Sequence, residues 1–236
     1  MPPPRSAKTT RSASRGGQSS ASRPAAKPDI ALELRRRIAA HDLPPGSKLS
    51  ESELAQEFGV PRTRVRDALS VLEQRGLVER IPNRGAVVMR LEWADVAHLY
   101  DVREVLEGLC VRLATVQAPK KRWQDALRHF KGPMAQYVAD GNLDAYIQDY
   151  EAFRRLLIES SASPVLEQML DSILERTQTL IRRIIILPGR AQQGLAQHTA
   201  MLEAMCAGDA EQAEALRRAN MRSAKAVLER YQKYLL

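Results

Sequence analysis

Apolar residues recur at helical spacing in three short segments near the start of the chain, at residues 29–41, 51–58 and 61–75. A Pro-Pro-Gly sequence follows the first segment, and a serine with a glutamate three residues later opens the second as a capping box. Gly59 separates the second segment from the third, and Gly76 ends the third. The pattern predicts three helices, with a tight turn between the last two.

Two short runs of β-prone residues follow, at 77–81 and 86–89, around a Pro-Asn-Arg-Gly turn. This spacing predicts a small β-hairpin. Three helices followed by a hairpin are typical of a winged helix-turn-helix, so residues 29–91 are predicted to form a DNA-binding domain.

From residue 92 to residue 236 the apolar spacing is helical throughout, and proline or glycine residues interrupt it at five points. The predicted helices cover residues 93–117, 121–139, 142–161, 164–187, 190–207 and 209–235. The sequence therefore predicts a mainly α fold, in which an antiparallel bundle of about six helices follows the winged helix.

Charge is unevenly distributed along the chain, whose net charge is +8. Residues 1–28 carry six basic side chains and no acid in a Pro-, Ser- and Gly-rich stretch, which predicts a disordered basic arm. Such an arm either contacts phosphates or has no role. Residues 92–236 are neutral, so we expect the front of the molecule to bind a polyanion.

Apolar runs and cysteines indicate where the protein is located. No apolar run approaches the length of a membrane span, which predicts a cytoplasmic protein without a membrane partner. Cys110 and Cys206 fall within apolar helical patterns and are expected to be reduced core residues.

The third helix is the candidate recognition helix, since its first turn is rich in side chains that bind DNA. We expect Arg62 to contact a guanine, Thr63 and Arg66 to contact bases and phosphates, and Arg35 to contact phosphate. At the wing tip, Arg84 is expected to enter the minor groove. The full predicted DNA surface is Arg35, Arg62, Thr63, Arg64, Arg66, Asn83, Arg84 and Gly85.

Four polar residues interrupt apolar faces of different predicted helices: Arg103, Arg154, His198 and Asn220. A buried polar side chain is unfavourable unless something pairs with it, so such positions indicate a binding cavity. A satisfied buried residue is the other interpretation of each of them alone.

Residues 43–91, LPPGSKLSESELAQEFGVPRTRVRDALSVLEQRGLVERIPNRGAVVMRL, resemble the DNA-binding domain of the GntR family. YDVREVLEGLCVRLA at 100–114 and HTAMLEAMCAGDAEQA at 198–213 are similar to its FCD subfamily. The resemblance implies a homodimer on a palindromic operator in double-stranded DNA, acting as a repressor under control of an organic acid. Two residues depart from the commonest pattern, namely Pro61 for a serine and Arg64 for a proline.

FCD domains commonly hold a divalent metal ion with an aspartate and three histidines. In this chain the resemblance puts Tyr150, Arg154, His198 and Asn220 at those positions, so one usual ligand remains. Arginine carries the wrong charge for a metal ligand. We therefore predict no metal and no cofactor, with an anionic effector held by Arg154 and helped by Arg103, Tyr150, His198 and Asn220.

Three alternatives stay open at this stage. A rearranged metal site would make the sensor metal-dependent. A sequence-tolerant architectural DNA-binding protein would explain the basic arm. Catalysis would need a nucleophile with a base and an orienting group, or a phosphate loop, and the sequence offers neither. We therefore expect no enzyme.

Overall fold

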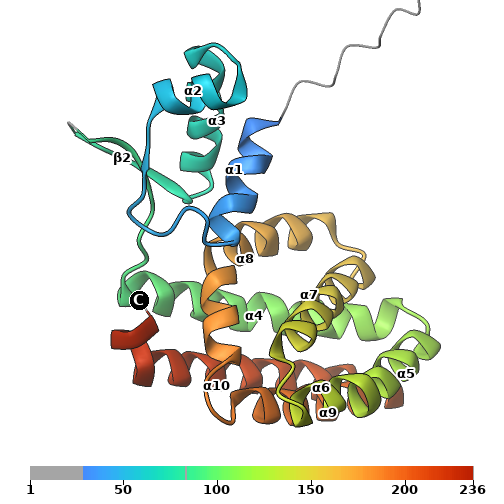
Figure 1. Ribbon diagram of the computed structural model, residues 1–236. Helices are drawn as coiled ribbons and strands as arrows, with labels where there is room; N and C mark the ends of the chain where they lie inside the picture. The colour runs from blue at the N-terminus through green and yellow to red at the C-terminus, as the bar shows by residue number, and fades with distance from the viewer. Residues whose placement is uncertain (1–28, 83, 236) are drawn as a thin grey trace, which may run out of the picture.

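A winged helix stands on a larger helical domain (Figure 1). The computed structural model describes residues 29–82 and 84–235. The predicted basic arm at residues 1–28 and the wing residue Asn83 lie outside these ranges. Within them, no helix combines the length and the apolar character that a membrane span requires.

The winged helix contains three helices, in the predicted order, and three short strands. The elements are α1 (Ile30–Ala39), β1 (Lys48–Leu49), α2 (Glu51–Phe58), α3 (Arg62–Gln74), β2 (Val78–Ile81) and β3 (Gly85–Val88). Their apolar faces enclose one buried cluster, in which Leu34, Leu54 and Leu69 meet residues of the wing. Ser50 caps α2 as predicted, since its hydroxyl accepts a hydrogen bond from the amide of Glu53.

The wing sheet has one strand more than the predicted hairpin. β3 is the central strand, with β2 antiparallel on one side and β1 antiparallel on the other. β1 consists of two residues, Lys48 and Leu49, which pair with Val87 and Ala86. Two residues are too few to show an alternation of apolar and polar side chains, so the sequence gives no sign of this strand.

The helical domain follows the predicted breaks closely. Its elements are α4 (Trp93–Gln117), α5 (Lys120–His129), η1 (Phe130–Met134), α6 (Ala135–Ala139), α7 (Leu143–Ser160), α8 (Pro164–Ile185), α9 (Arg190–Ala207) and α10 (Ala210–Leu235). α4 and α10 lie side by side and run in opposite directions (Figure 1). The fold is mainly helical, with a winged helix followed by a helical domain, as predicted.

One predicted helix, at 121–139, is interrupted. The segment η1 winds as a π-helix and contains Pro133. Proline has no amide hydrogen and its ring displaces the carbonyl one turn earlier, so a regular α-helical turn cannot continue through it. The wider turn brings Phe130 and Met134 into the core, where both are buried.

α8 connects the parts of the molecule. Leu170 and Leu174 lie in the main core of the helical domain, while Leu180 and Ile184 belong to a second cluster with α4 and α10. The same helix also contacts α1 of the winged helix. α8 therefore packs against both halves of the structure.

Candidate functional site

The first turn of α3 is exposed at the outer end of the winged helix. Gly59 ends α2 in the left-handed conformation, with φ +62°, and the chain enters α3 through Pro61. Pro61 offers no side chain that caps the first amides of α3. Unsatisfied amides at a helix start favour an anion, so this turn suits a phosphate group.

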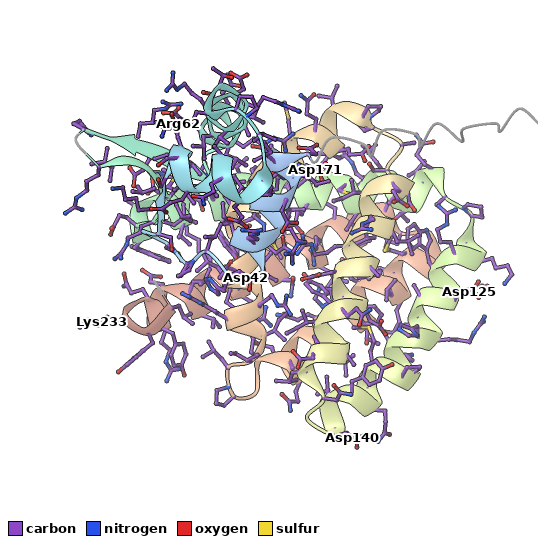
Figure 2. All side chains as sticks on the ribbon, turned by 45° about the horizontal axis from the view of Figure 1, so that its top comes forward. Asp42, Arg62, Asp125, Asp140, Asp171 and Lys233 are labelled. Atoms are coloured by element: carbon purple, nitrogen blue, oxygen red, sulfur yellow. The ribbon has the colours of Figure 1, made fainter. Side chains whose placement is uncertain are left out.

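The basic side chains of this turn differ in their surroundings. Arg62, Thr63 and Arg64 are exposed, and Figure 2 shows Arg62 on the side of the molecule away from Asp125 and Asp140. Arg66 is already paired. Its Nε and Nη2 donate to the two carboxylate oxygens of Glu51, at 3.1 and 2.8 Å.

The Arg66–Glu51 pair joins α3 to the first turn of α2. The hydrogen bond from Arg66 lowers the pKa of Glu51, so the carboxylate stays ionised. Glu51 thus fixes the direction of Arg66 on the exposed side of α3. Arg66 differs in this respect from Arg62, whose guanidinium extends from the exposed first turn of α3.

A hollow lies between the wing and the start of α2. Lys48, Arg80 and Arg84 are among the residues that line it, and its volume is about 640 Å³. Arg80 is held by Glu73 at 3.0 Å and by Ser70 at 3.1 Å. Arg84 and Gly85 are exposed at the tip, whereas Asn83 lies outside the described residues.

Arg35 lies apart from this surface. Its guanidinium forms an ion pair with Glu175 of α8, at the contact between the winged helix and the helical domain. The structure therefore brings together Arg62, Thr63, Arg64, Arg66, Arg84 and Gly85, but not Arg35.

Inside the helical domain a cavity of about 40 Å³ lies between α4, α7, α8, α9 and α10. Its lining includes four of the five residues that the sequence proposed for the effector, namely Arg103, Tyr150, His198 and Asn220. The fifth, Arg154, does not line it. Arg154 lies in a smaller adjoining space of about 10 Å³ with Glu107 and Arg217.

Three arginines and one acid are buried among the described residues: Arg103, Arg190, Arg217 and Glu107. Arg103 Nε donates to Glu107 Oε1 at 2.8 Å, and Arg217 forms an ion pair with the other oxygen. Burial raises the pKa of Glu107, but Arg217 and Arg103 outweigh burial and bring it to about 2. One ionised carboxylate faces more than one cation, so the cluster has a surplus of positive charge.

Arg154 adds to this surplus from outside the cavity. Its Cζ lies 5.8 Å from the centre of the Tyr150 ring. Its Nε and Nη1 atoms are buried and have no hydrogen-bond partner in the described part of the chain. Burial lowers the pKa of Arg154, and Tyr150 and Glu107 oppose that effect.

His198 is neutral and both its ring nitrogens are engaged. Burial and then Arg217 lower its pKa to about 3. Nδ1 lies 2.6 Å from the carbonyl oxygen of Gly194, so Nδ1–H donates to that oxygen. The lone pair of Nε2 then accepts a hydrogen bond from Arg217 Nη1, at 2.8 Å.

The residues at the FCD metal positions do not fit a divalent cation. Arg217 takes up the lone pair of His198 Nε2 and also donates to Asn220 Oδ1, at 3.2 Å. Asp149, which is next to Tyr150 in sequence, faces the surface and pairs with His129 at 2.6 Å. Within residues 29–82 and 84–235, no group of three His, Cys, Asp or Glu side chains is arranged to hold a metal ion.

The sequence missed Arg217, Glu107 and Arg190. Helical spacing could have indicated the first two. Glu107 is four residues after Arg103, and Arg217 is three residues before Asn220. Both spacings put the residue on the same helix face as a predicted cavity residue. Arg217 was not predicted because the next residue, Arg218, is also an arginine, and two successive arginines are typical of a solvent-exposed helix face.

Two segments of the chain match known protein families. Residues 27–88 match the family of bacterial regulatory proteins called gntR, and residues 98–223 match the FCD domain. The chain belongs to the GntR family, in its FCD branch. GntR-family proteins are DNA-binding transcription regulators, so this chain is a regulator and not an enzyme.

Individual relatives agree with this assignment. The regulator LutR of Bacillus subtilis is 32% identical over 216 residues, which cover 80% of this chain and 95% of LutR. The gluconate operon repressor of the same species is 42% identical over 78 residues, or 33% of this GntR protein and 32% of the repressor. The structure of Escherichia coli McbR/YncC superimposes with a TM-score of 0.69 at 22% identity, over 87% of this chain and 96% of that one.

Proposed function

We propose that this regulator represses transcription as a homodimer on a palindromic operator, and that a small organic anion bound without a metal changes its affinity for DNA. The observation that carries the proposal is the surplus of buried arginine around the cavity. A buried cation without a counterion is unfavourable, and a bound carboxylate supplies the missing charge.

The lining of the cavity combines hydrogen-bond donors with hydrocarbon. Arg103, Arg190 and three tyrosines, Tyr100, Tyr146 and Tyr150, contribute the donors. Ile181, Ile184 and Ile185 of α8 form an apolar wall. A carboxylate with a short hydrocarbon part matches both kinds of lining. Because about 40 Å³ is less than an organic acid needs, its binding includes a movement of the lining side chains apart.

We assign the direct contacts with the anion to Arg103 and Arg190. Arg190 Nε is buried without a partner in the described residues, and Nη1 makes only long hydrogen bonds of 3.3 and 3.5 Å to glutamines. The two terminal nitrogens of Arg217 are occupied by Glu107, His198 and Asn220, so we assign Arg217 the role of positioning them. Arg154 contributes positive charge from outside the lining.

Calorimetry with unbranched carboxylic acids of two to five carbons tests the effector site. We expect at least one acid to bind the wild-type protein equally well with and without added metal. Arg190→Gln should weaken that binding at least tenfold. Arg182→Gln is the matched control, since Arg182 is exposed at the end of α8. Equal binding by Arg190→Gln and wild type would refute the site, and a requirement for stoichiometric zinc would refute metal independence.

Footprinting on DNA selected from a random library tests the operator. A dimeric winged helix reads two half-sites about 10 base pairs apart, or a multiple of that spacing, on one face of the duplex. We therefore expect a protected palindrome and a dimer in analytical ultracentrifugation. Protection that does not depend on sequence would favour an architectural protein instead.

A further inference from the structure

The carboxylate of Glu175 lies where the two halves of the molecule meet. Glu175 belongs to α8, and its side chain is 13% exposed. Figure 1 shows the end of α1 beside α8 at this contact. Glu175 is thus a residue of the helical domain that reaches the DNA-binding domain.

Two arginines of the winged helix converge on this one carboxylate. Arg75, which ends the recognition helix α3, donates from Nη1 to both oxygens of Glu175, at 2.9 and 3.0 Å. Arg35 of α1 forms an ion pair with Oε1. One negative charge therefore faces two positive charges. Burial and then the repulsion from Arg75 lower the pKa of Arg35.

Neighbouring contacts position the same two helices. The side chain of Arg176 packs on Gly76, directly after α3, where a Cβ atom would lie 3.1 Å from Arg176 Nε. Arg183 Nη2 donates to His41 Nε2 at 3.0 Å, just beyond α1. Glu175 is the acidic member of this junction, and its carboxylate binds two guanidinium groups that DNA phosphates would also attract.

We propose that Glu175 is a positioning residue for DNA binding, which holds Arg35 and Arg75 on the helical domain and competes with DNA phosphate for Arg35. The inference rests on the DNA binding of the proposed function and on the phosphate contact that the sequence predicts for Arg35. Arg35 cannot pair fully with Glu175 and with a phosphate at once. Binding to DNA therefore includes the release of Arg35 from Glu175.

The effector cavity adjoins the same part of α8. Thr177 follows Glu175 by two residues, and its hydroxyl accepts a hydrogen bond from Arg103 Nη1 at 3.5 Å. Arg103 lines the cavity. An anion that binds Arg103 thus acts on the helical turn that carries Glu175, which gives the cavity a physical route to the junction.

Glu175→Gln tests the competition, with Glu167→Gln as a matched control, because Glu167 is an exposed acid of the same helix. Affinity is measured by fluorescence anisotropy on a 30-base-pair random duplex at several salt concentrations. We expect Glu175→Gln to bind about tenfold more tightly at low salt, because one more cation becomes free for phosphate. The slope of log K against log salt should change by less than about 0.9, the contribution of one phosphate contact, because Arg35 contacts phosphate in both complexes.

A double-mutant cycle shows whether the gain acts through Arg35. In the background Arg35→Gln, the change Glu175→Gln should raise affinity less than twofold, and the control Glu167→Gln should change affinity less than twofold in either background. Hydrogen exchange should show faster opening of α1 in Glu175→Gln. Unchanged or weaker DNA binding by Glu175→Gln, with the fold intact by circular dichroism, would overturn the proposal. Binding to the random duplex requires neither a palindrome nor an effector. The outcome for Glu175 is therefore independent of whether the proposed operator and effector are correct.

Discussion

The buried arginines around Glu107 explain how a polar centre survives inside the helical domain. Glu107 balances part of the charge of Arg103 and Arg217, and His198 accepts from Arg217 as a neutral ring. Most of the polar atoms of this centre are paired with one another, which stabilises polar groups in a core, while Nε of Arg190 and Nε of Arg217 have no partner in the described residues. The remaining positive charge is what makes the centre suitable for an anion.

Replacing Glu107 by glutamine should destabilise the protein by about 3–5 kcal/mol, because two buried guanidinium groups lose their counterion. Urea unfolding at pH 7 measures the loss. Glu104→Gln is the control, since Glu104 is less buried and pairs with exposed Arg222. A loss below about 1 kcal/mol for Glu107→Gln would contradict the charge account.

The acid stability of wild type should reflect the same carboxylate. Its pKa is about 2 in the folded protein against an ordinary value of 4.5, so its contribution is present above pH 4.5 and is lost as the pH falls toward 2. We expect the unfolding free energy to fall across this range on the order of 3 kcal/mol more in wild type than in Glu107→Gln. Parallel pH profiles of the two proteins would contradict the assignment.

His198 should not titrate at moderately acidic pH. Its pKa of about 3 lies far below the ordinary 6.5, so the neutral ring stabilises the fold above pH 6.5, and stability is lost as the pH falls toward 3. NMR of the four histidines should show ring signals of His198 that do not shift between pH 8 and pH 5. A midpoint near 6.5 for His198 would contradict a ring held by Arg217 and Gly194.

At the residue scale, the sequence picked out residues that lie around one cavity, and their role in binding an effector stays a prediction. Arg103, His198 and Asn220 interrupt apolar stripes, and each of them lines the cavity. Arg154 interrupts a stripe in the same way, yet it lies in the adjoining space. Helical spacing fixes a direction from the helix axis, but the side on which a long arginine ends depends on neighbouring helices, which one sequence does not reveal.

At the scale of elements, glycine and proline positions made the helix boundaries predictable. Gly59 has a left-handed backbone at the end of α2, and Gly208 has one at the end of α9. The elements that were not predicted are the short strand β1 and the π-turn at Pro133. β1 depends on its pairing with β3, and the π-turn follows from Pro133 inside the predicted helix.

Two glycine substitutions separate backbone conformation from packing. Gly59→Ala should destabilise the winged helix by about 1 kcal/mol, because φ is +62° and alanine disfavours that region. Gly132→Ala, in the π-turn, should be neutral or stabilise by up to about 1 kcal/mol, since alanine loses less entropy in a helix. An added Cβ meets nothing within 4 Å at either site. Thermal unfolding measures both, and equal effects would contradict the explanation.

At the scale of the whole molecule, α8 lines the cavity of the helical domain and contacts the winged helix. It provides the isoleucine wall of the cavity and the carboxylate that holds Arg35 and Arg75. The first turn of α3 stands exposed on the outer side (Figure 2). A change in the cavity therefore has a short path through one helix to the orientation of the winged helix.

The most direct test measures DNA affinity in metal-free protein while small carboxylic acids are added. Fluorescence anisotropy on the selected operator, with a chelator present, gives the dissociation constant for wild type and for Arg190→Gln. We predict that at least one acid changes the wild-type constant fivefold or more, and that Arg190→Gln binds the operator but does not respond. Loss of the response on chelation, or an equal response in both proteins, would contradict an anion sensor that works without a metal.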